Sequence, residues 1–330
     1  MKYPSKIDVP VLITFFARPQ TLEKVFESVR AARPSTLLLW QDGPRPNRPD
    51  DLEGIRKCRE IVENIDWECS VYTNYHDNNM GCDPSTFLAQ KWAFEVVDKC
   101  IIMEDDRVPS PTYYTFCKEL LDKYEFDERI SHICGTNILG EYSECPSDYF
   151  FSPFGSTTWA SWRRVAKSWD EAYSYLQDEY SLSCLKSILG KDLYNAMISV
   201  AQRHAKTGFQ WWETILGMGA MMNNRLAIIP KRNMITDLGM TENSTHATAN
   251  PKLVSKAARK MFHMKAFDLE GPIKHPDYIL PDFNYVKKLL FISGKGHPFL
   301  KLSRKIMFGL RCIMYGEFGQ LKKSLLNHTK

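Results

Sequence analysis

The first hundred residues alternate between short apolar segments and amphipathic segments, and this alternation limits the folds open to the chain more than any other feature. The apolar segments expected to form strands are 9–16, 35–45, 67–75 and 99–107. Apolar residues recur at helical spacing in the segments between them, 21–32, 50–65 and 84–97. Strands that alternate with helices form a parallel sheet with crossover helices. The sequence therefore predicts an α/β fold, and 44% hydrophobic residues in a chain of 330 can bury a full core.

Three adjacent acids end the fourth predicted strand. Glu104, Asp105 and Asp106 follow an apolar run, and Pro109 and Pro111 stop the strand from continuing. Adjacent carboxylates repel one another unless a cation gathers them, and hard ions such as Mg²⁺ or Mn²⁺ prefer carboxylate oxygens. Open α/β sheets bind ligands at the carboxyl ends of their strands. We therefore expect a Mn²⁺ or Mg²⁺ site that neutralises a departing nucleoside diphosphate; the alternative is a solvated acidic turn that caps the next helix.

Several blocks of the sequence resemble a known enzyme family. The blocks are VLITFFARP, WQDGPR, IIMEDDRVPSPTYYTF, FGSTTWASW, TGFQWWETI, PKRNMITDLGMTENSTHAT and GPIKHPDYIL. Together they resemble the GT-A inverting glycosyltransferases, most closely the N-acetylglucosaminyltransferase I family and the bacterial polysaccharide glycosyltransferases related to it. The resemblance runs in blocks from about Pro10 to Leu280.

The resemblance implies a GT-A fold, the nucleotide-diphospho-sugar transferase fold, with a mostly parallel central sheet flanked by helices. Residues 1–130 would form the nucleotide-sugar-binding half, and residues 131–283 the acceptor-binding and catalytic half of the same domain. Residues 284–330 would add a basic C-terminal helical extension. The implied activity is transfer of a sugar, with inversion, from a nucleotide-diphosphate donor such as a UDP-sugar to a saccharide or lipid-linked glycan in surface polysaccharide biosynthesis.

The resemblance also assigns roles around the donor. Arg18 matches the arginine that meets the donor diphosphate, and a guanidinium fork suits phosphate oxygens. Asp42 matches the aspartate that accepts a hydrogen bond from uracil. Asn79 and Gly81 would line the donor pocket. The alternatives are a surface arginine that opens a helix, a turn-forming Asp-Gly pair at 42–43, and a glycine at 81 that only supplies a turn.

Among the three acids, Asp106 matches the direct metal ligand. Glu104 and Asp105 would hold the ribose and the metal-bound water. His246 follows a polar segment and matches a late loop histidine that reaches the metal or the diphosphate, since a neutral imidazole is a reasonable ligand for Mn²⁺. The alternative for His246 is an ordinary surface histidine.

An inverting transfer needs a carboxylate that takes the proton of the acceptor hydroxyl. Glu213 is the one acid in the segment GFQWWETILG, where the resemblance expects this base, and Trp211 and Trp212 would offer a sugar-stacking face. Asp170 and Asp237 are the reserve candidates for the base. The alternative for Glu213 is a surface glutamate at the start of a helix.

The C-terminal segment 284–330 differs in charge from the rest of the chain. It holds ten Lys and Arg against one Glu, whereas the remainder holds 33 basic and 38 acidic residues. Basic residues mixed with apolar ones at helical spacing are typical of a helix that lies in a membrane interface. We expect an anionic membrane surface as the partner and no nucleic acid; the alternative is a helix packed on the body with a solvated basic face.

Nine scattered cysteines without a C-x-x-C pair indicate reduced thiols in a cytosol. No signal peptide or membrane-spanning segment is recognisable. We therefore expect a cytoplasmic protein that associates peripherally with the inner face of the membrane.

Two other functions compete with glycosyl transfer. A sugar-nucleotide nucleotidylyltransferase has a similar sheet, but it carries a Gly-rich loop after its first strand, and the segment FFARPQT contains no glycine. A non-catalytic nucleotide-sugar-binding module is the other alternative, and the intact acids with Glu213 argue against it.

Overall fold

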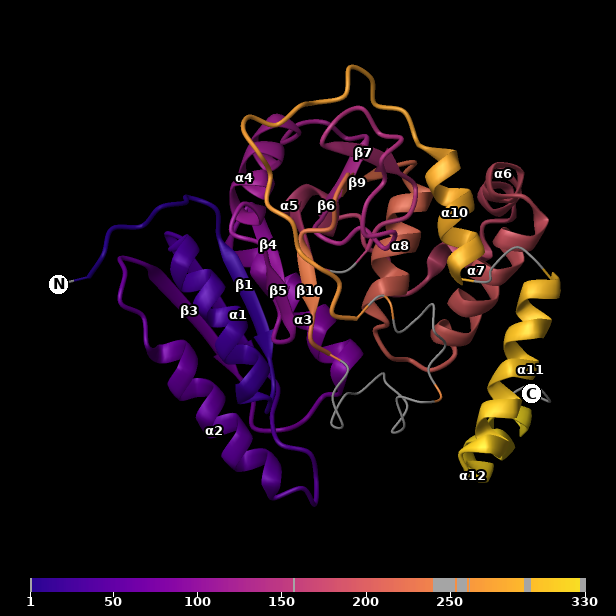
Figure 1. Cartoon of the computed structure of the whole chain (residues 1–330), viewed down its shortest axis with the longest axis horizontal. Helices are drawn as coiled ribbons and strands as arrows, with labels where there is room; N and C mark the ends of the chain where they lie inside the picture. Colours follow the sequence, from indigo (N-terminus) through magenta and orange to yellow (C-terminus); the bar gives the residue numbers. More distant parts are fainter. Residues whose placement is uncertain are drawn as a thin grey trace.

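The structure is a computed structural model that describes residues 2–156, 158–239, 253, 260, 262–293 and 298–326. An eight-stranded sheet forms its centre, with helices on both faces (Figure 1). The strands are β1 Val11–Phe15, β2 Thr36–Gln41, β3 Ser70–Tyr75, β4 Lys99–Glu104, β6 Ile130–Cys134, β7 Tyr149–Ser152, β8 Trp159–Trp162 and β9 Leu226–Pro230. Their spatial order is β3-β2-β1-β4-β8-β6-β9-β7.

The sheet is mostly parallel. Strands β3, β2, β1 and β4 are parallel neighbours, and so are β6 and β9. Strand β8 runs antiparallel between β4 and β6, and β7 runs antiparallel to β9 at the edge. This arrangement confirms the predicted α/β fold with a mostly parallel central sheet flanked by helices.

Alternate residues of the central strands face two different helix layers, which is why the strands read as continuous apolar runs. The helices are α1 Pro19–Ala32, α2 Asp50–Glu63, α3 Cys82–Val96, α4 Tyr113–Lys123, α5 Arg163–Ala166, the 3₁₀ turn η1 Ser174–Gln177, α6 Glu179–Leu189, α7 Lys191–Ala205 and α8 Trp212–Met222. Val11 and Ile13 belong to the core formed with α1, α2 and α4. Leu12 belongs to the core formed with α3, α7 and α8, which also contains the buried Trp159.

Three further helices follow in the C-terminal segment, α10 Phe283–Ser293, α11 Pro298–Met314 and α12 Phe318–Leu326. Helix α10 packs on the body, because Tyr285 is 2% exposed and its ring contacts those of Tyr142 and Phe150. The expected basic extension therefore begins with a helix that belongs to the core. No helix among the described residues is both long enough and apolar enough to span a membrane.

A buried histidine on β6 links stability to pH. His132 is 4% exposed, its Nδ1 lies 2.7 Å from Ser131 Oγ, and burial lowers its pKa from 6.5 to about 4. Between pH 6.5 and pH 4, His132 is protonated in the unfolded chain but stays neutral in the folded protein. The free energy of unfolding should therefore fall as the pH drops towards 4. A shift of this size corresponds to about 3 kcal/mol. Urea unfolding across this pH range measures the effect.

A His132→Asn variant is the comparison for this prediction. It lacks the titrating ring, so its free energy of unfolding should fall less steeply over the same pH interval, whatever its absolute stability. Equal slopes for the two proteins would show that other groups cause the acid sensitivity.

Candidate functional site

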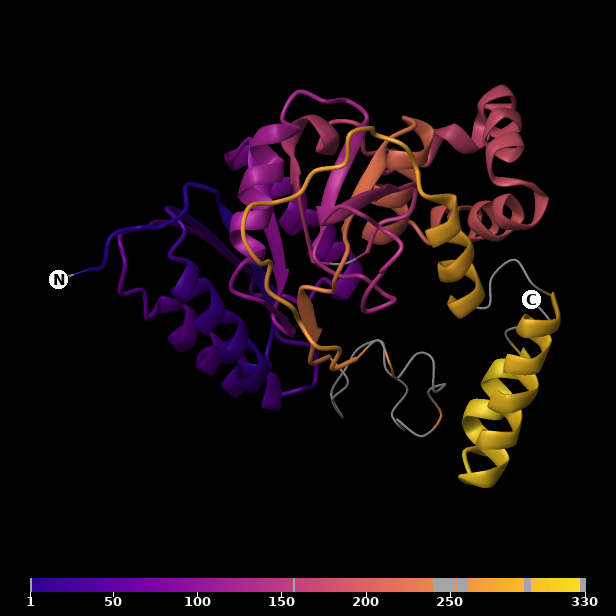
Figure 2. The ribbon, with the colours of Figure 1, turned by 45° about the horizontal axis from the view of Figure 1, so that its top comes forward.

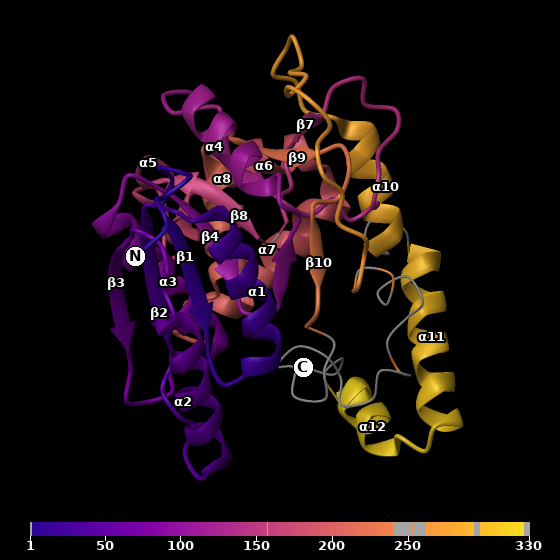
Figure 3. The same cartoon turned by 60° about the vertical axis from the view of Figure 1, so that its left-hand side comes forward.

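The carboxyl ends of three parallel strands meet at one edge of the sheet. Thr14 of β1 lies opposite Glu104 of β4, and Phe15 lies opposite Gln41 of β2. A small second sheet adjoins this edge, in which β5 Arg107–Pro109 pairs antiparallel with β10 Ile235–Asp237 (Figure 3 shows β1, β4 and β10). The segments after β1, β2 and β4 therefore face one region, together with the end of β10.

Arg18 holds two of the three acids. Its Nη1 donates to Asp106 Oδ2 at 2.9 Å, its Nη2 donates to Asp105 Oδ1, and its Nε lies 3.4 Å from Asp105 Oδ2. The backbone N–H of Phe16 also donates to Asp105 Oδ2 at 3.3 Å. The short connection from β1 to α1 is thus tied to the acidic turn after β4.

Arg107 is a second cation of this cluster and was not singled out in the sequence. Its Nη1 forms an ion pair with Asp237 Oδ2 at 2.6 Å, and its Nε lies 3.4 Å from Glu104 Oε2 and 3.5 Å from Asp106 Oδ1. The β5–β10 pairing places Asp237 directly opposite Arg107. Asp237, a reserve candidate for the base, therefore lies among the acids.

The acids of the cluster carry more negative charge than the two arginines balance. Burial raises the pKa of Glu104 to about 7, Arg107 opposes this rise, and the neighbouring charges of Asp106 and Glu213 add to it. Burial also raises the pKa of Asp105 against the effect of Arg18. The pKa of Asp237 is raised by burial as well. A cation placed beside buried carboxyl groups with raised pKa values stabilises their charged forms.

Asp106 and Asp237 both lie against the backbone of Gly239. A Cβ at this position would lie 2.7 Å from Asp106 Oδ2 and 3.0 Å from Asp237 Oδ1, so only a glycine fits beside the two acids. The described residues contain no group of three His, Cys, Asp or Glu able to hold a metal ion. Mg²⁺ commonly uses one or two carboxylates and completes its shell with water and phosphate, so this pair of acids fits. His246 lies outside the described residues.

Asp42 joins the loops that follow β2 and precede α3. Its carboxylate accepts hydrogen bonds from the backbone N–H groups of Gly43, Met80 and Gly81 at 2.9–3.2 Å and from Asn79 Nδ2 at 3.0 Å. Burial raises its pKa, and these donors oppose the rise. Asp42, Asn79 and Gly81 therefore lie together. A carboxylate has about four acceptor positions, so four donors already occupy Asp42.

Glu213 lies in the first turn of α8, and its side chain is exposed. Its charge is one of the causes of the raised pKa of Glu104, an acid of this edge. Trp211 stacks on His204 with ring centroids 4.2 Å apart, and its Nε1 donates to Thr207 Oγ1 at 2.9 Å. Trp212 points the other way and is 6% exposed within the core. Of the two tryptophans expected to stack on a sugar, only Trp211 is partly exposed.

Asp170, the other reserve candidate, has a local structural task. Its carboxylate accepts from the backbone N–H of Ala172 at 3.1 Å and from Ser174 Oγ at 2.8 Å. These bonds hold the chain that leads into η1.

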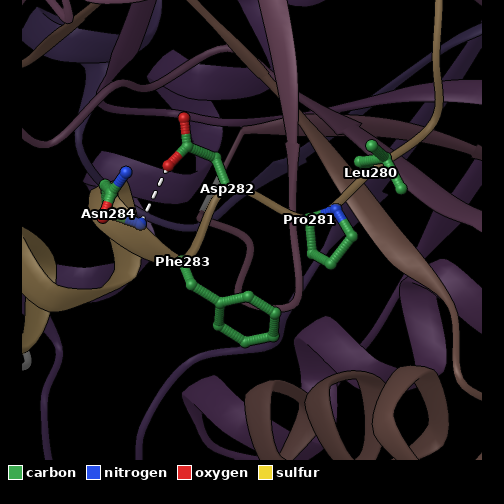
Figure 4. A pocket seen from close by; sticks show the side chains of 5 residues that line it. All are labelled: Leu280, Pro281, Asp282, Phe283 and Asn284. Carbon is green, nitrogen blue, oxygen red and sulfur yellow. Dashed lines mark hydrogen bonds between the residues drawn. The ribbon is translucent and has the colours of Figure 1, made fainter.

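A hollow near the start of α10 shares no lining residue with the acidic cluster (Figure 4). It is lined by Leu280, Pro281, Asp282, Phe283 and Asn284.

Comparison with known proteins adds only distant likenesses. No protein-family model and no curated protein matches the chain. The structure of UDP-glucose pyrophosphorylase complexed with UDP-glucose is similar over 72% of this chain and 95% of its own, with 8% identity and a TM-score of 0.37. That of 4-diphosphocytidyl-2C-methyl-D-erythritol synthase from Anaerococcus prevotii DSM 20548 covers 52% and 78%, with 11% identity and a TM-score of 0.30. Likeness at this level does not identify an activity.

Proposed function

We propose that the protein is a metal-dependent glycosyltransferase that moves a sugar from a nucleotide-diphosphate donor to an acceptor hydroxyl. The observation that carries this proposal is the meeting of Asp105, Asp106 and Asp237 with Arg18 and Arg107 at the carboxyl edge of the sheet. Acids that can hold a cation, next to guanidinium groups that can bind phosphate, are what a departing diphosphate requires. Glu213, at the same edge, adds a candidate base.

The leaving diphosphate is the first task of the site. Asp106 and Asp237 would hold Mn²⁺ or Mg²⁺, which when bound supplies positive charge to the leaving phosphate oxygens. The Arg18 side chain is only 25% exposed and pairs with both Asp105 and Asp106. Its guanidinium group would therefore lie beside the phosphate oxygens of a donor bound at these acids. Glu104 and Asp105 complete the donor side, where we assign them to the ribose and to metal-bound water.

The nucleoside would lie near Asp42, Asn79 and Gly81. Because four donors already occupy the Asp42 carboxylate, we assign it to holding the two loops together, and this holds Asn79 and the backbone around Gly81 in position. The preference for a uridine nucleotide comes from the resemblance of the WQDGPR segment, and Asp42 would support it indirectly.

The acceptor is assigned to the side of α8. Glu213 is exposed in the first helical turn and would take the proton of the attacking hydroxyl, as an inverting displacement requires. Trp211, fixed by His204 and Thr207, offers a rigid aromatic wall two residues before this base. An aromatic wall of this kind suits the apolar face of a sugar ring, so the acceptor class is a saccharide or a lipid-linked glycan of a surface polysaccharide.

Nucleotidylyl transfer is the second candidate, because the two similar solved structures bear the names of a pyrophosphorylase and a synthase. The connection from β1 to α1 argues against it. This connection consists of Phe16, Ala17 and Arg18 only and has no glycine, so it lacks the exposed run of backbone N–H groups that would cradle a triphosphate.

One assay separates these candidates. The protein is incubated with Mn²⁺ and a panel of nucleotide sugars, in one series with saccharide acceptors and in another with pyrophosphate, and the products are identified by mass spectrometry. Release of a nucleoside diphosphate supports glycosyl transfer. Formation of a nucleoside triphosphate from a nucleotide sugar and pyrophosphate supports nucleotidylyl transfer. If every donor stays intact with a set of saccharide acceptors present, the catalytic proposal fails.

A further inference from the structure

The last two helices expose an apolar face. On α11 the exposed large apolar side chains include Leu302, Ile306, Leu310 and Ile313, each between 53% and 56% exposed. They recur every three or four residues and therefore form one stripe along the helix. Met307 and Met314 flank this stripe, 49% and 66% exposed, and Phe318 at the start of α12 is 62% exposed.

Other positions of α11 make the intramolecular contacts. Cys312 is fully buried, and Gly309 lies close to Leu321 of α12, since a Cβ on Gly309 would be 3.7 Å from its Cδ1. Arg311 Nη1 donates to the backbone oxygen of Leu253 at 3.4 Å, and Arg304 Nη2 donates to that of Phe291 at 3.3 Å. The orientation of α11 thus turns its apolar stripe outward, against the usual pattern for a helix on a body.

Helices α11 and α12 lie beyond α10, at the end of the molecule opposite strands β1–β3 (Figures 1 and 2). We propose that this apolar face, with the basic residues around it, binds the surface of an anionic lipid membrane. An amphipathic helix with an apolar stripe and basic flanks lies in the plane of the interface and buries the stripe among the acyl chains. This proposal does not depend on the catalytic one.

Charge decides among the possible occupants of this face. The segment 284–330 carries ten basic residues and one acid, and the rest of the chain carries an excess of acids. A second copy docked by the same face would bring two strongly basic segments together, and such like charges repel across a symmetric interface. Anionic lipid headgroups instead attract each basic residue near the surface. Exposed Lys305 lies on α11 beside the stripe and would meet them.

Vesicle flotation tests the proposal with the full chain. The protein should float with vesicles that contain phosphatidylglycerol and remain unbound with pure phosphatidylcholine, and added salt should weaken the binding. A Leu310→Glu/Ile313→Glu variant should lose at least about tenfold in partitioning, because two inserted side chains become charged. A Leu310→Ser/Ile313→Ser variant should also bind more weakly, without any change of net charge.

The matched control is Tyr180→Glu/Ile188→Glu, which adds the same charge at two exposed apolar positions of α6 and should float like the original protein. Light scattering records the oligomeric state of each protein. The proposal is wrong if anionic vesicles fail to float the protein at low salt, or if the α11 variants float equally well. A dimer that dissociates in both α11 variants, without vesicle binding, would assign the face to a second copy instead.

Discussion

Replacing Asp106 with asparagine is expected to lower kcat by at least about 10²-fold, the scale for losing one electrostatic stabiliser of a transition state. Asp106 pairs with Arg18 at 2.9 Å and, like Asp237, lies close to Gly239. The amide keeps the shape of the side chain but removes the charge that would hold a divalent ion. Turnover of the donor identified in the product assay, measured over a range of Mn²⁺ concentrations, checks this expectation.

The matched control for Asp106→Asn is Asp170→Asn, an equivalent change at a carboxylate that only holds the chain before η1. The control should keep its turnover. Calorimetric titration with Mn²⁺ provides a readout apart from activity, and Asp106→Asn should bind the ion much more weakly. Full activity of this variant, or of the original protein in saturating EDTA, would contradict the assigned metal role.

Glu213→Gln is expected to abolish transfer while leaving donor binding intact. Loss of a general base typically costs about 10²- to 10⁴-fold in rate. Glutamine keeps the size of the side chain, which is exposed in the first turn of α8. Loss of the Glu213 charge also removes one cause of the raised pKa of Glu104, which favours the charged form of that acid. Donor affinity, measured by fluorescence or calorimetry, should therefore not fall.

Glu179→Gln is the control for this second variant, because Glu179 is also an exposed glutamate in the first turn of a helix, α6. It should transfer sugar at the original rate. If Glu213→Gln transfers equally well, the base is another residue. Weak donor binding by Glu213→Gln would point instead to a role in holding the nucleotide sugar.

Local pattern predicted the first half of the sheet well. The apolar runs 9–16 and 99–107 contain β1 and β4, and the spacing of Leu22, Val25 and Val29 correctly indicated the buried side of α1. Burial on both faces of a parallel strand makes such runs easy to recognise. The strand-end rule also brought Arg18 and the acids to one edge, because it depends on connectivity along the chain and on the parallel direction of neighbouring strands.

Distant pairing was not predictable in the same way. Strand β8 inserts between β4 and β6, although it follows both in the chain, and β10 pairs with β5 across more than a hundred residues. Nothing in the local pattern near Arg107 indicates that Asp237 lies opposite it. The place of α10 was also decided by packing, since its basic residues suggested an extension while Tyr285 inserts into the core.

The sequence by itself determined the layered α/β architecture and the strand end where the acids gather, because hydrophobic periodicity and chain order act locally. Only the tertiary structure decided which distant side chains complete the cluster, that Trp211 rather than Trp212 is accessible near Glu213, and that α11 turns its apolar stripe outward. These features depend on contacts between segments far apart in the chain. Their free energy comes from the burial and pairing of both partners together, and neither segment carries that information alone.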